Sequence, residues 1–261
     1  MANDALNLNP PNADEHITTH GSDWLWAAFS IFGLSFLVVL VLNFLRPRGT
    51  RLFHELALVI LMVASVSYFS MASDLGATPI DVEFRGDGTR QIWYVRYIQW
   101  FITFPLLLLE LLLSTGLSVS DVMTTLFMSL VLTVSWLVGS LVPSTYKWGY
   151  YTFGCAALFY IWYVLLWLAP RTTFAAGGVF RPAYLRLATY FCFMLITYPI
   201  AWACAEGGNV ISPTSEMIWY GILDIFAGPV FLFAFLWHLK DVNYSIFGLR
   251  SGKYTDTAEK V

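Results

Sequence analysis

Seven long apolar segments constrain the fold of this chain more than any other feature of its sequence. Each has about 20 residues, the length that an α-helix needs to cross the hydrocarbon core of a bilayer. Charged residues make up 12% of the chain, about half of the ~25% that is usual in a soluble domain. Both observations predict an all-α membrane protein built as a bundle of seven transmembrane helices. The expected spans are 23–45, 52–73, 92–114, 121–142, 148–169, 183–205 and 214–239.

The bundle is expected to occupy residues 23–240, between an extracellular segment, 1–22, and a cytoplasmic tail, 241–261. Its orientation follows from basic residues in the short loops, because these concentrate on the cytoplasmic side of a membrane. The loops after the first, fifth and seventh spans are the basic ones. They hold Arg46, Arg48, Arg51, Arg171, Arg181, Arg186, Lys240, Arg250 and Lys253. The N-terminus is therefore expected outside and the C-terminus in the cytoplasm, with the plasma membrane as the expected location.

One long loop, 74–91, is expected on the outer side of the bundle. It contains a partly alternating stretch with the dipeptide Asp87-Gly88, which is typical of a tight hairpin turn. We therefore expect a short hairpin over the outer mouth.

The composition also argues against several classes of protein. The net charge is −3 and no basic surface is evident, so a nucleic-acid partner is not expected. The cysteines Cys155, Cys192 and Cys204 lie in apolar stretches with no metal-binding spacing. The sequence has no nucleophile–base pair, metal cluster or nucleotide-binding loop, so we expect neither an enzyme nor a metal site.

Ionisable residues inside the expected spans are few, and such groups are functional candidates because burying them in a membrane is costly. In span three, one helical face carries Arg96, Gln99, Thr103 and Phe104. In span seven, one face carries Glu216, Tyr220, Asp224 and Gly228.

A buried aspartate needs a partner, and Arg96 is the only cation expected in the outer half of the bundle. We therefore expect Arg96 to contact Asp224, with Tyr68 donating a hydrogen bond to the same carboxylate. The alternative is that these polar groups only hold the helices together.

Several motifs resemble the microbial (type 1) rhodopsin family over residues 25–240. The segment RYIQWFITFPLLLLELL in span three is similar to the family pattern Arg-Tyr-x-Asp-Trp followed by Thr-Thr-Pro-Leu-Leu-Leu-Leu-Asp. TYPIAW, EGGNVISP and ILDIFAG resemble the family's sixth and seventh helices and the loop between them. The resemblance implies a seven-helix fold, and it is greatest to fungal opsin-related proteins that lack the retinal-binding lysine.

The same resemblance implies that the retinal site is altered. The family attaches retinal to a lysine one turn after the aspartate of span seven, and that position here is Gly228. The chain has four lysines, Lys147, Lys240, Lys253 and Lys260, and none is expected to reach the site. Gln99 replaces the carboxylate that accepts the proton. Three further positions of the retinal pocket differ from the family pattern: Phe104, Trp136 and Leu195.

Other positions match the family. The resemblance assigns to the pocket Tyr68, Trp100, Thr103, Tyr198 and Trp202, although such aromatic residues are also common in helix cores. It assigns Glu206 and Glu216 to the external proton-release pair, for which solvated helix ends are the alternative. Glu110 takes the place of the cytoplasmic proton donor, or reaches the membrane interface.

Three functions remain open at this point. The first is a membrane protein without covalent retinal that is not a light-driven pump and has an interaction, stress-related or small-ligand role. The second is light-independent transport of protons or ions. The third is a receptor that holds retinal or another isoprenoid non-covalently. Membrane lipids and a homo-oligomer are the expected partners, and the sequence identifies no protein partner.

Overall fold

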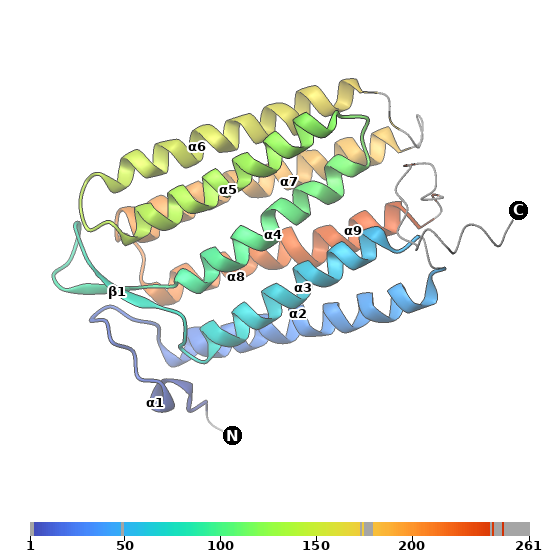
Figure 1. The fold of residues 1–261 in the computed structure, drawn as a ribbon. Helices are drawn as coiled ribbons and strands as arrows, with labels where there is room; N and C mark the ends of the chain where they lie inside the picture. The colour runs from blue at the N-terminus through green and yellow to red at the C-terminus, as the bar shows by residue number, and fades with distance from the viewer. Residues whose placement is uncertain are drawn as a thin grey trace, which may run out of the picture.

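The computed structural model of the protein describes residues 3–47, 50–172, 174, 180–240, 242 and 247. Within them, seven helical units are long and apolar enough to cross a membrane, and they lie side by side in one bundle (Figure 1). The first four units are the uninterrupted helices α2 (Thr19–Leu45), α3 (Leu52–Ala72), α4 (Tyr94–Leu113) and α5 (Val119–Leu141). The predicted seven-helix architecture is confirmed, with boundaries that differ from the expected ones by up to four residues.

Each of the last three units contains a π-helical segment. The fifth unit is α6 (Lys147–Tyr163), η1 (Val164–Leu168) and the 3₁₀ turn η2 (Ala169–Arg171). The sixth is α7 (Arg181–Trp202) and η4 (Ala203–Gly207), and the seventh is α8 (Pro213–Ile225), η5 (Phe226–Val230) and α9 (Phe231–His238). Pro229 lies inside η5 and has no amide hydrogen to donate, which favours a local break in α-helical bonding. The seventh unit is therefore locally widened at Phe226–Val230.

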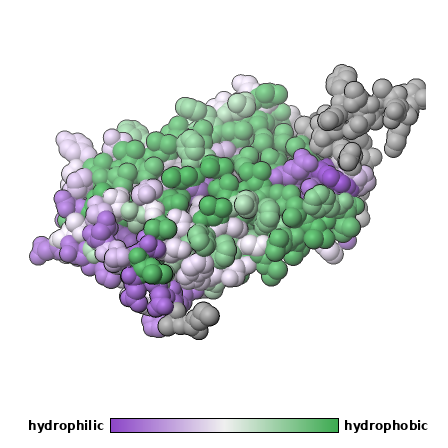
Figure 2. Space-filling view, turned by 60° about the horizontal axis from the view of Figure 1, so that its bottom comes forward, coloured by the Kyte–Doolittle hydropathy of each residue, from purple (hydrophilic) through white to green (hydrophobic). Residues whose placement is uncertain are grey.

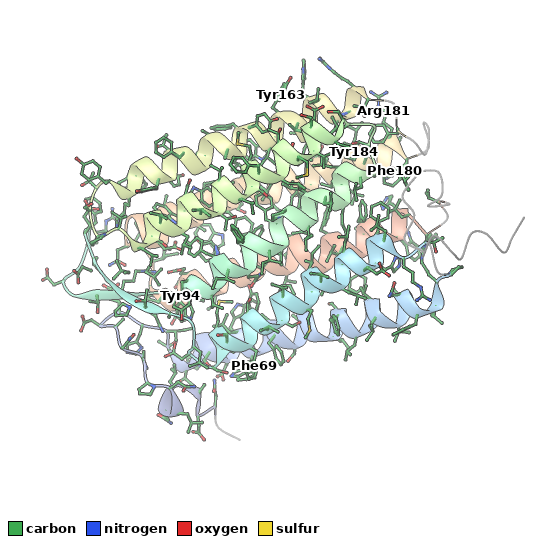
Figure 3. The ribbon with its side chains drawn as sticks, in the orientation of Figure 1. Phe69, Tyr94, Tyr163, Phe180, Arg181 and Tyr184 are labelled. Atoms are coloured by element: carbon green, nitrogen blue, oxygen red, sulfur yellow. The ribbon has the colours of Figure 1, made fainter. Side chains whose placement is uncertain are left out.

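The outer surface of the bundle suits a lipid environment. A broad hydrophobic band covers its middle, with hydrophilic residues gathered toward the two ends (Figure 2). Large apolar side chains on this band are well exposed, such as Leu34, Phe153 and Phe193. Figure 3 shows Phe69 and Tyr94 toward the end that carries the hairpin, and Arg181 at the opposite end.

The expected hairpin over one end of the bundle is confirmed. Strand β1 (Thr78–Asp81) pairs antiparallel with β2 (Thr89–Ile92), and Ile80 lies opposite Arg90. The N-terminal segment contains a short helix, α1 (Ala5–Leu8), and then runs beside β2, where Glu15 pairs with Arg90.

A second contact fastens the N-terminal segment to the hairpin. The Asp14 carboxylate accepts hydrogen bonds from the backbone nitrogen of Thr89 at 2.8 Å and from the Thr89 hydroxyl at 2.9 Å. The backbone bond, followed by the hydroxyl bond, holds the pKa of Asp14 below its ordinary value. Helix α2 begins after Thr18, whose side chain caps it, and Asp14 and Glu15 before it lie against the hairpin.

Some expectations concern residues outside the described part of the chain. The cytoplasmic tail, 241–261, is described only at Val242 and Phe247. The basic loop residues Arg48, Arg250 and Lys253, and the fourth lysine, Lys260, also lie outside it.

Candidate functional site

Asp224 is the centre of a buried hydrogen-bond network that joins α3, α4, α7 and α8. Its Oδ2 atom accepts a hydrogen bond from the Tyr68 hydroxyl at 2.7 Å, and its Oδ1 atom accepts one from the Tyr198 hydroxyl at 2.7 Å. The indole nitrogen of Trp100 donates to Oδ1 at 3.1 Å, and the Gln99 amide donates to Oδ2 at 3.4 Å. The side chain is 3% exposed. Four neutral donors thus surround the Asp224 carboxylate. One of them is the Tyr68 hydroxyl, so this expected hydrogen bond is confirmed.

The predicted contact between Arg96 and Asp224 is wrong. Among the described residues no hydrogen bond or ion pair joins the two, and the guanidinium carbon of Arg96 lies 3.2 Å from the ring centroid of Tyr220. The Nε and Nη1 atoms of Arg96 are buried without a hydrogen-bond partner. The prediction failed because Asp224 is satisfied by neutral donors, while the aromatic face of Tyr220 receives the cation.

Gly228 faces Phe32, which comes from α2. A side-chain carbon added at Gly228 would lie 3.1 Å from Cε1 of Phe32, closer than ordinary van der Waals contact. The Phe32 ring also stacks on Tyr68, with centroids 4.8 Å apart. The neighbour of Gly228 is thus a residue of α2 that the sequence analysis did not single out.

A cavity of about 10 Å³ remains between Gly228 and Asp224, and it is also lined by Gln99, Trp100 and Thr103. This volume is about what one water molecule needs. The Oε1 atom of Gln99 is buried without a partner in the described residues, so the residues around this cavity offer a water at least one acceptor.

A second cavity, of about 30 Å³, lies on the other side of Trp100. Its lining contains most of the residues that were expected in the pocket: Trp100, Phe104, Trp136, Leu195 and Tyr198. The ring of Trp136 fills the space over Gly154, where an added side-chain carbon would lie 2.1 Å from Nε1 of the indole. Trp202 does not line this cavity; its indole nitrogen donates to the carbonyl of Trp136 at 3.3 Å.

Glu206 and Glu216 are both buried near the hairpin end of the bundle, at 6% and 2% exposure, so they are not solvated helix ends. The Glu206 carboxylate accepts hydrogen bonds from the hydroxyls of Tyr97 at 2.7 Å and Tyr220 at 3.0 Å. Glu216 instead accepts from Nη2 of Arg90 at 2.5 Å. The two glutamates therefore have separate partners.

Arg90 is the functional candidate that the sequence analysis missed. It lies in the loop 74–91, for which only a hairpin was expected, but its side chain is buried and forms ion pairs with Glu216 and, at 3.6 Å, with Glu15. It also donates to the Asn209 amide oxygen and, at 2.8 Å, to the carbonyl of Ile211. Burial lowers the pKa of Arg90, but the neighbouring carboxylates, Glu216 above all, outweigh it and raise the pKa above its ordinary value.

Glu110 lies apart from this network. It is 0% exposed on α4, and neither carboxylate oxygen has a hydrogen-bond partner in the described residues. The alternative that it reaches the membrane interface is therefore wrong. A buried carboxyl without partners is costly, which makes Glu110 a candidate for a functional group.

The two described lysines lie at the ends of the bundle. Lys147 begins α6 and lies 3.8 Å from the Glu83 carboxylate, and its amine donates to the carbonyl of Glu206 at 3.4 Å. Lys240 follows α9, with its amine 4.0 Å from the ring centroid of Trp237. Neither amine lies at the cavities beside Asp224. Within the described residues no group of three His, Cys, Asp or Glu side chains could hold a metal ion.

Comparison with known proteins finds relatives of one family, by sequence and by structure. A family model described as Bacteriorhodopsin-like protein matches residues 19–241. Protein FDD123 of Trametes versicolor is 73% identical over 256 residues, which are 98% of this chain and 90% of the relative. The opsin-like protein carO of Fusarium fujikuroi is 44% identical, and the match covers 95% of this chain and 84% of the relative's length. The 30 kDa heat shock protein of Saccharomyces cerevisiae is 38% identical, and the match covers 85% of this chain and 74% of the relative's length.

Among solved structures, the light-driven proton pump Coccomyxa subellipsoidea rhodopsin has the same fold. The match has a TM-score of 0.82 at 33% identity and covers 85% of this chain and 98% of the pump. The relatives thus include an opsin-like protein and a light-driven proton pump.

Proposed function

Since the chain belongs to the bacteriorhodopsin-like protein family, we propose that it is a family member without retinal, with a role other than light-driven pumping. One observation carries the proposal: Gly228, one turn beyond Asp224, offers no amine and faces the ring of Phe32. A protonated Schiff base, which gives the family its colour, cannot form on glycine.

The residues around Asp224 do not fit retinal. The two cavities beside it have volumes of about 10 and 30 Å³. Pockets that hold small organic molecules usually enclose about 300–1,000 Å³. Phe104 and Trp136 occupy space along the larger cavity, so a polyene would require both to move. The same volumes argue against non-covalent binding of retinal or another isoprenoid.

At the place of a pigment site, the core contains a hydrogen-bond network around Asp224 that links four helices. Such a network suits a scaffold that presents its surfaces to partners, and we assign the protein an interaction or stress-related role. The relationship to a 30 kDa heat shock protein supports this assignment. A spanning bundle of seven helices makes it a multi-pass membrane protein. We further propose that it lies in the plasma membrane with the hairpin end outside.

The spectrum of the purified protein tests the absence of a pigment. With or without added all-trans retinal, we expect no visible band, because no buried amine lies at the site. A visible band that bleaches with hydroxylamine would refute the proposal.

The variant Gly228→Lys separates loss of the amine from loss of the pocket. It should stay colourless with retinal, because Phe104 and Trp136 still fill the larger cavity. Adding Phe104→Thr and Trp136→Gly should allow colour to develop, with Asp224 as counterion. Colour in Gly228→Lys alone would show that the pocket accepts retinal without those changes.

Light-independent proton conduction is the second candidate, and the partner-free carboxyl of Glu110 favours it. Proton flux in liposomes should then fall in Glu110→Leu, while the melting temperature stays the same or rises because an unsatisfied polar group is removed. Flux equal to that of empty liposomes in the wild type would eliminate this candidate.

The proposed orientation is tested with a tag after Val261. In sealed, right-side-out vesicles the tag should resist protease until detergent is added. Digestion of the tag without detergent would show that the C-terminus lies outside, which is the opposite of the proposed orientation.

A further inference from the structure

A wide hollow in the described part of the molecule lies outside the helix bundle's core, between α1 and the hairpin ends of α2 and α3. We call it the outer groove, and it has a volume of about 610 Å³. This size is within the ~300–1,000 Å³ range of small-molecule pockets. Its lining residues are Asn3, Asp4, Ala5, Leu8, Asn9, Asp23, Trp26 and Ser73.

The groove adjoins the lipid-facing surface at Trp26. The Trp26 ring meets Phe29 and Phe69 edge to face, at centroid distances of 5.8 and 5.5 Å. Phe69 is 48% exposed and lies toward the hairpin end of the bundle (Figure 3). Tryptophan is favoured at the level of lipid headgroups, where one side of the ring is apolar and the other is hydrated. Trp26 therefore marks the depth at which headgroups meet acyl chains.

The charge of the groove is one-sided. Two carboxylates, Asp4 and Asp23, line it, and no lysine, arginine or histidine does. Asp23 accepts a hydrogen bond from the Asn3 amide at 2.8 Å, and Asp4 accepts one from the Asn7 amide at 3.4 Å. Neither aspartate belongs to any of the ion pairs formed by the described residues. Among the described residues, the groove thus presents negative charge without a paired cation, beside an aromatic ring.

The segment that forms one wall is fixed to the bundle. Asn3 donates to the Ser22 hydroxyl at 2.9 Å, and Asn9 donates to the carbonyl of Ser73 at 2.8 Å. The short helix α1 is held between these two contacts. The groove is therefore a formed feature of the outer surface, open to the solvent and bordered by the lipid-facing rings.

We propose that the outer groove binds the cationic headgroup of a phospholipid from the surrounding leaflet, with choline as the best fit. Aromatic rings attract quaternary ammonium groups, and the carboxylates of Asp4 and Asp23 complement the same charge. The acyl chains lie along Phe69 and Phe29, on the lipid-facing side of Trp26. A phospholipid, not a soluble cation, is the occupant because the aromatic wall continues into the apolar band.

Native mass spectrometry of the full chain tests the proposal. The protein is released from nanodiscs that contain equal amounts of dioleoyl phosphatidylcholine and dioleoyl phosphatidylglycerol, and the retained lipids are counted. The wild type should retain the choline lipid about tenfold over the glycerol lipid, equivalent to about 1.4 kcal/mol. The double variant Asp4→Asn/Asp23→Asn and the single variant Trp26→Leu should each reduce this ratio at least threefold. Matched controls are Asp87→Asn, an exposed carboxylate of the hairpin, and Phe153→Leu, a lipid-facing ring elsewhere, and neither should change it.

Three results would overturn the proposal. The first is equal retention of the two lipids by the wild type. The second is an unchanged ratio in the groove variants, provided that their melting temperatures match the wild type and so exclude misfolding. The third is displacement of the lipid by millimolar soluble choline, since that would make the groove a site for a free cation.

Discussion

The substitution Asp224→Leu tests whether neutral donors, and not Arg96, hold the central carboxylate. It would leave Tyr68, Tyr198 and Trp100 without their acceptor, and these bonds measure 2.7, 2.7 and 3.1 Å. A hydrogen bond to a charged group is worth about 1.5–3 kcal/mol in soluble proteins, whereas polar contacts between membrane helices average about 0.6 kcal/mol. An intermediate value of about 1 kcal/mol for each bond gives a loss of about 3 kcal/mol.

That loss should be visible in thermal unfolding in detergent, followed by tryptophan fluorescence and circular dichroism. For a chain of this length, 1 kcal/mol shifts the melting temperature by about 2–4 °C, so we expect a decrease of about 6–12 °C. Asp224→Asn should be milder, because the amide keeps one oxygen that can accept hydrogen bonds.

Double-mutant cycles assign the loss to particular partners. Combining Asp224→Leu with Tyr198→Phe should give a coupling of about 1 kcal/mol, because the two side chains share a bond. The pair Asp224→Leu and Arg96→Gln should couple less than Asp224→Leu and Tyr198→Phe. Tyr184→Phe is the control, because this buried hydroxyl donates to Leu165, and its effect should add to that of Asp224→Leu. A coupling of Asp224 to Arg96 that exceeds its coupling to Tyr198 would refute the arrangement described above.

Two further predictions concern the hairpin end of the bundle. Arg90→Gln leaves Glu216 buried without its cation and should lower the free energy of unfolding by about 3–5 kcal/mol. The control Arg85→Gln, at the exposed tip of the hairpin, should leave the free energy of unfolding unchanged. An unchanged melting temperature in Arg90→Gln would contradict the structure. Asp14→Asn should be less stable than the wild type at neutral pH. The folded-state pKa of Asp14 lies below its ordinary value of 3.8. The stabilisation by the ionised carboxylate is therefore complete above pH 3.8 and is lost as the pH falls through the folded-state pKa. The difference in melting temperature should therefore close on acidification, and a constant difference would be the contrary result.

The sequence was sufficient to predict which face of the third and seventh spanning units turns inward. The residues spaced along one face of α4 and of α8 are all buried, and they are Arg96, Gln99, Thr103, Phe104, Glu216, Tyr220, Asp224 and Gly228. Helical periodicity is a local property of the chain, so it survives whatever the neighbouring helices do. The break at Gly228-Pro229 was predictable for the same reason.

Partners across the bundle were not predictable in this way. Phe32 and Gly228 meet although 196 residues separate them, and neither position carries a signal of the other. The ion pair of Arg90 with Glu216 joins a loop strand to α8 over 126 residues. For Arg96 the rule that a buried cation seeks a carboxylate gave the wrong partner, since an aromatic face was also available.

The balance of buried charge explains why the replacements at Gly228 and Gln99 occur in the same protein. By the family resemblance, Gly228 stands for a lysine and Gln99 for a carboxylate, so the core has lost one cation and one anion. Losing the lysine alone would have left two carboxylates against Arg96, and an uncompensated buried charge is costly. With Gln99 neutral, Arg96 and Asp224 balance each other without touching.

The reverse experiment tests this coupling. Gly228→Lys alone adds an unmatched buried cation and should lower the melting temperature, beyond the steric effect of Phe32. Restoring the anion with Gln99→Asp should recover part of that loss, whereas Gln99→Asp by itself should destabilise, because it adds a second buried carboxylate on the side of α4 that faces Asp224. The sign of the interaction between the two substitutions is therefore the measurement that matters. If the double variant is no more stable than the sum of the single effects predicts, the two replacements were independent, and the balance of buried charge does not link them.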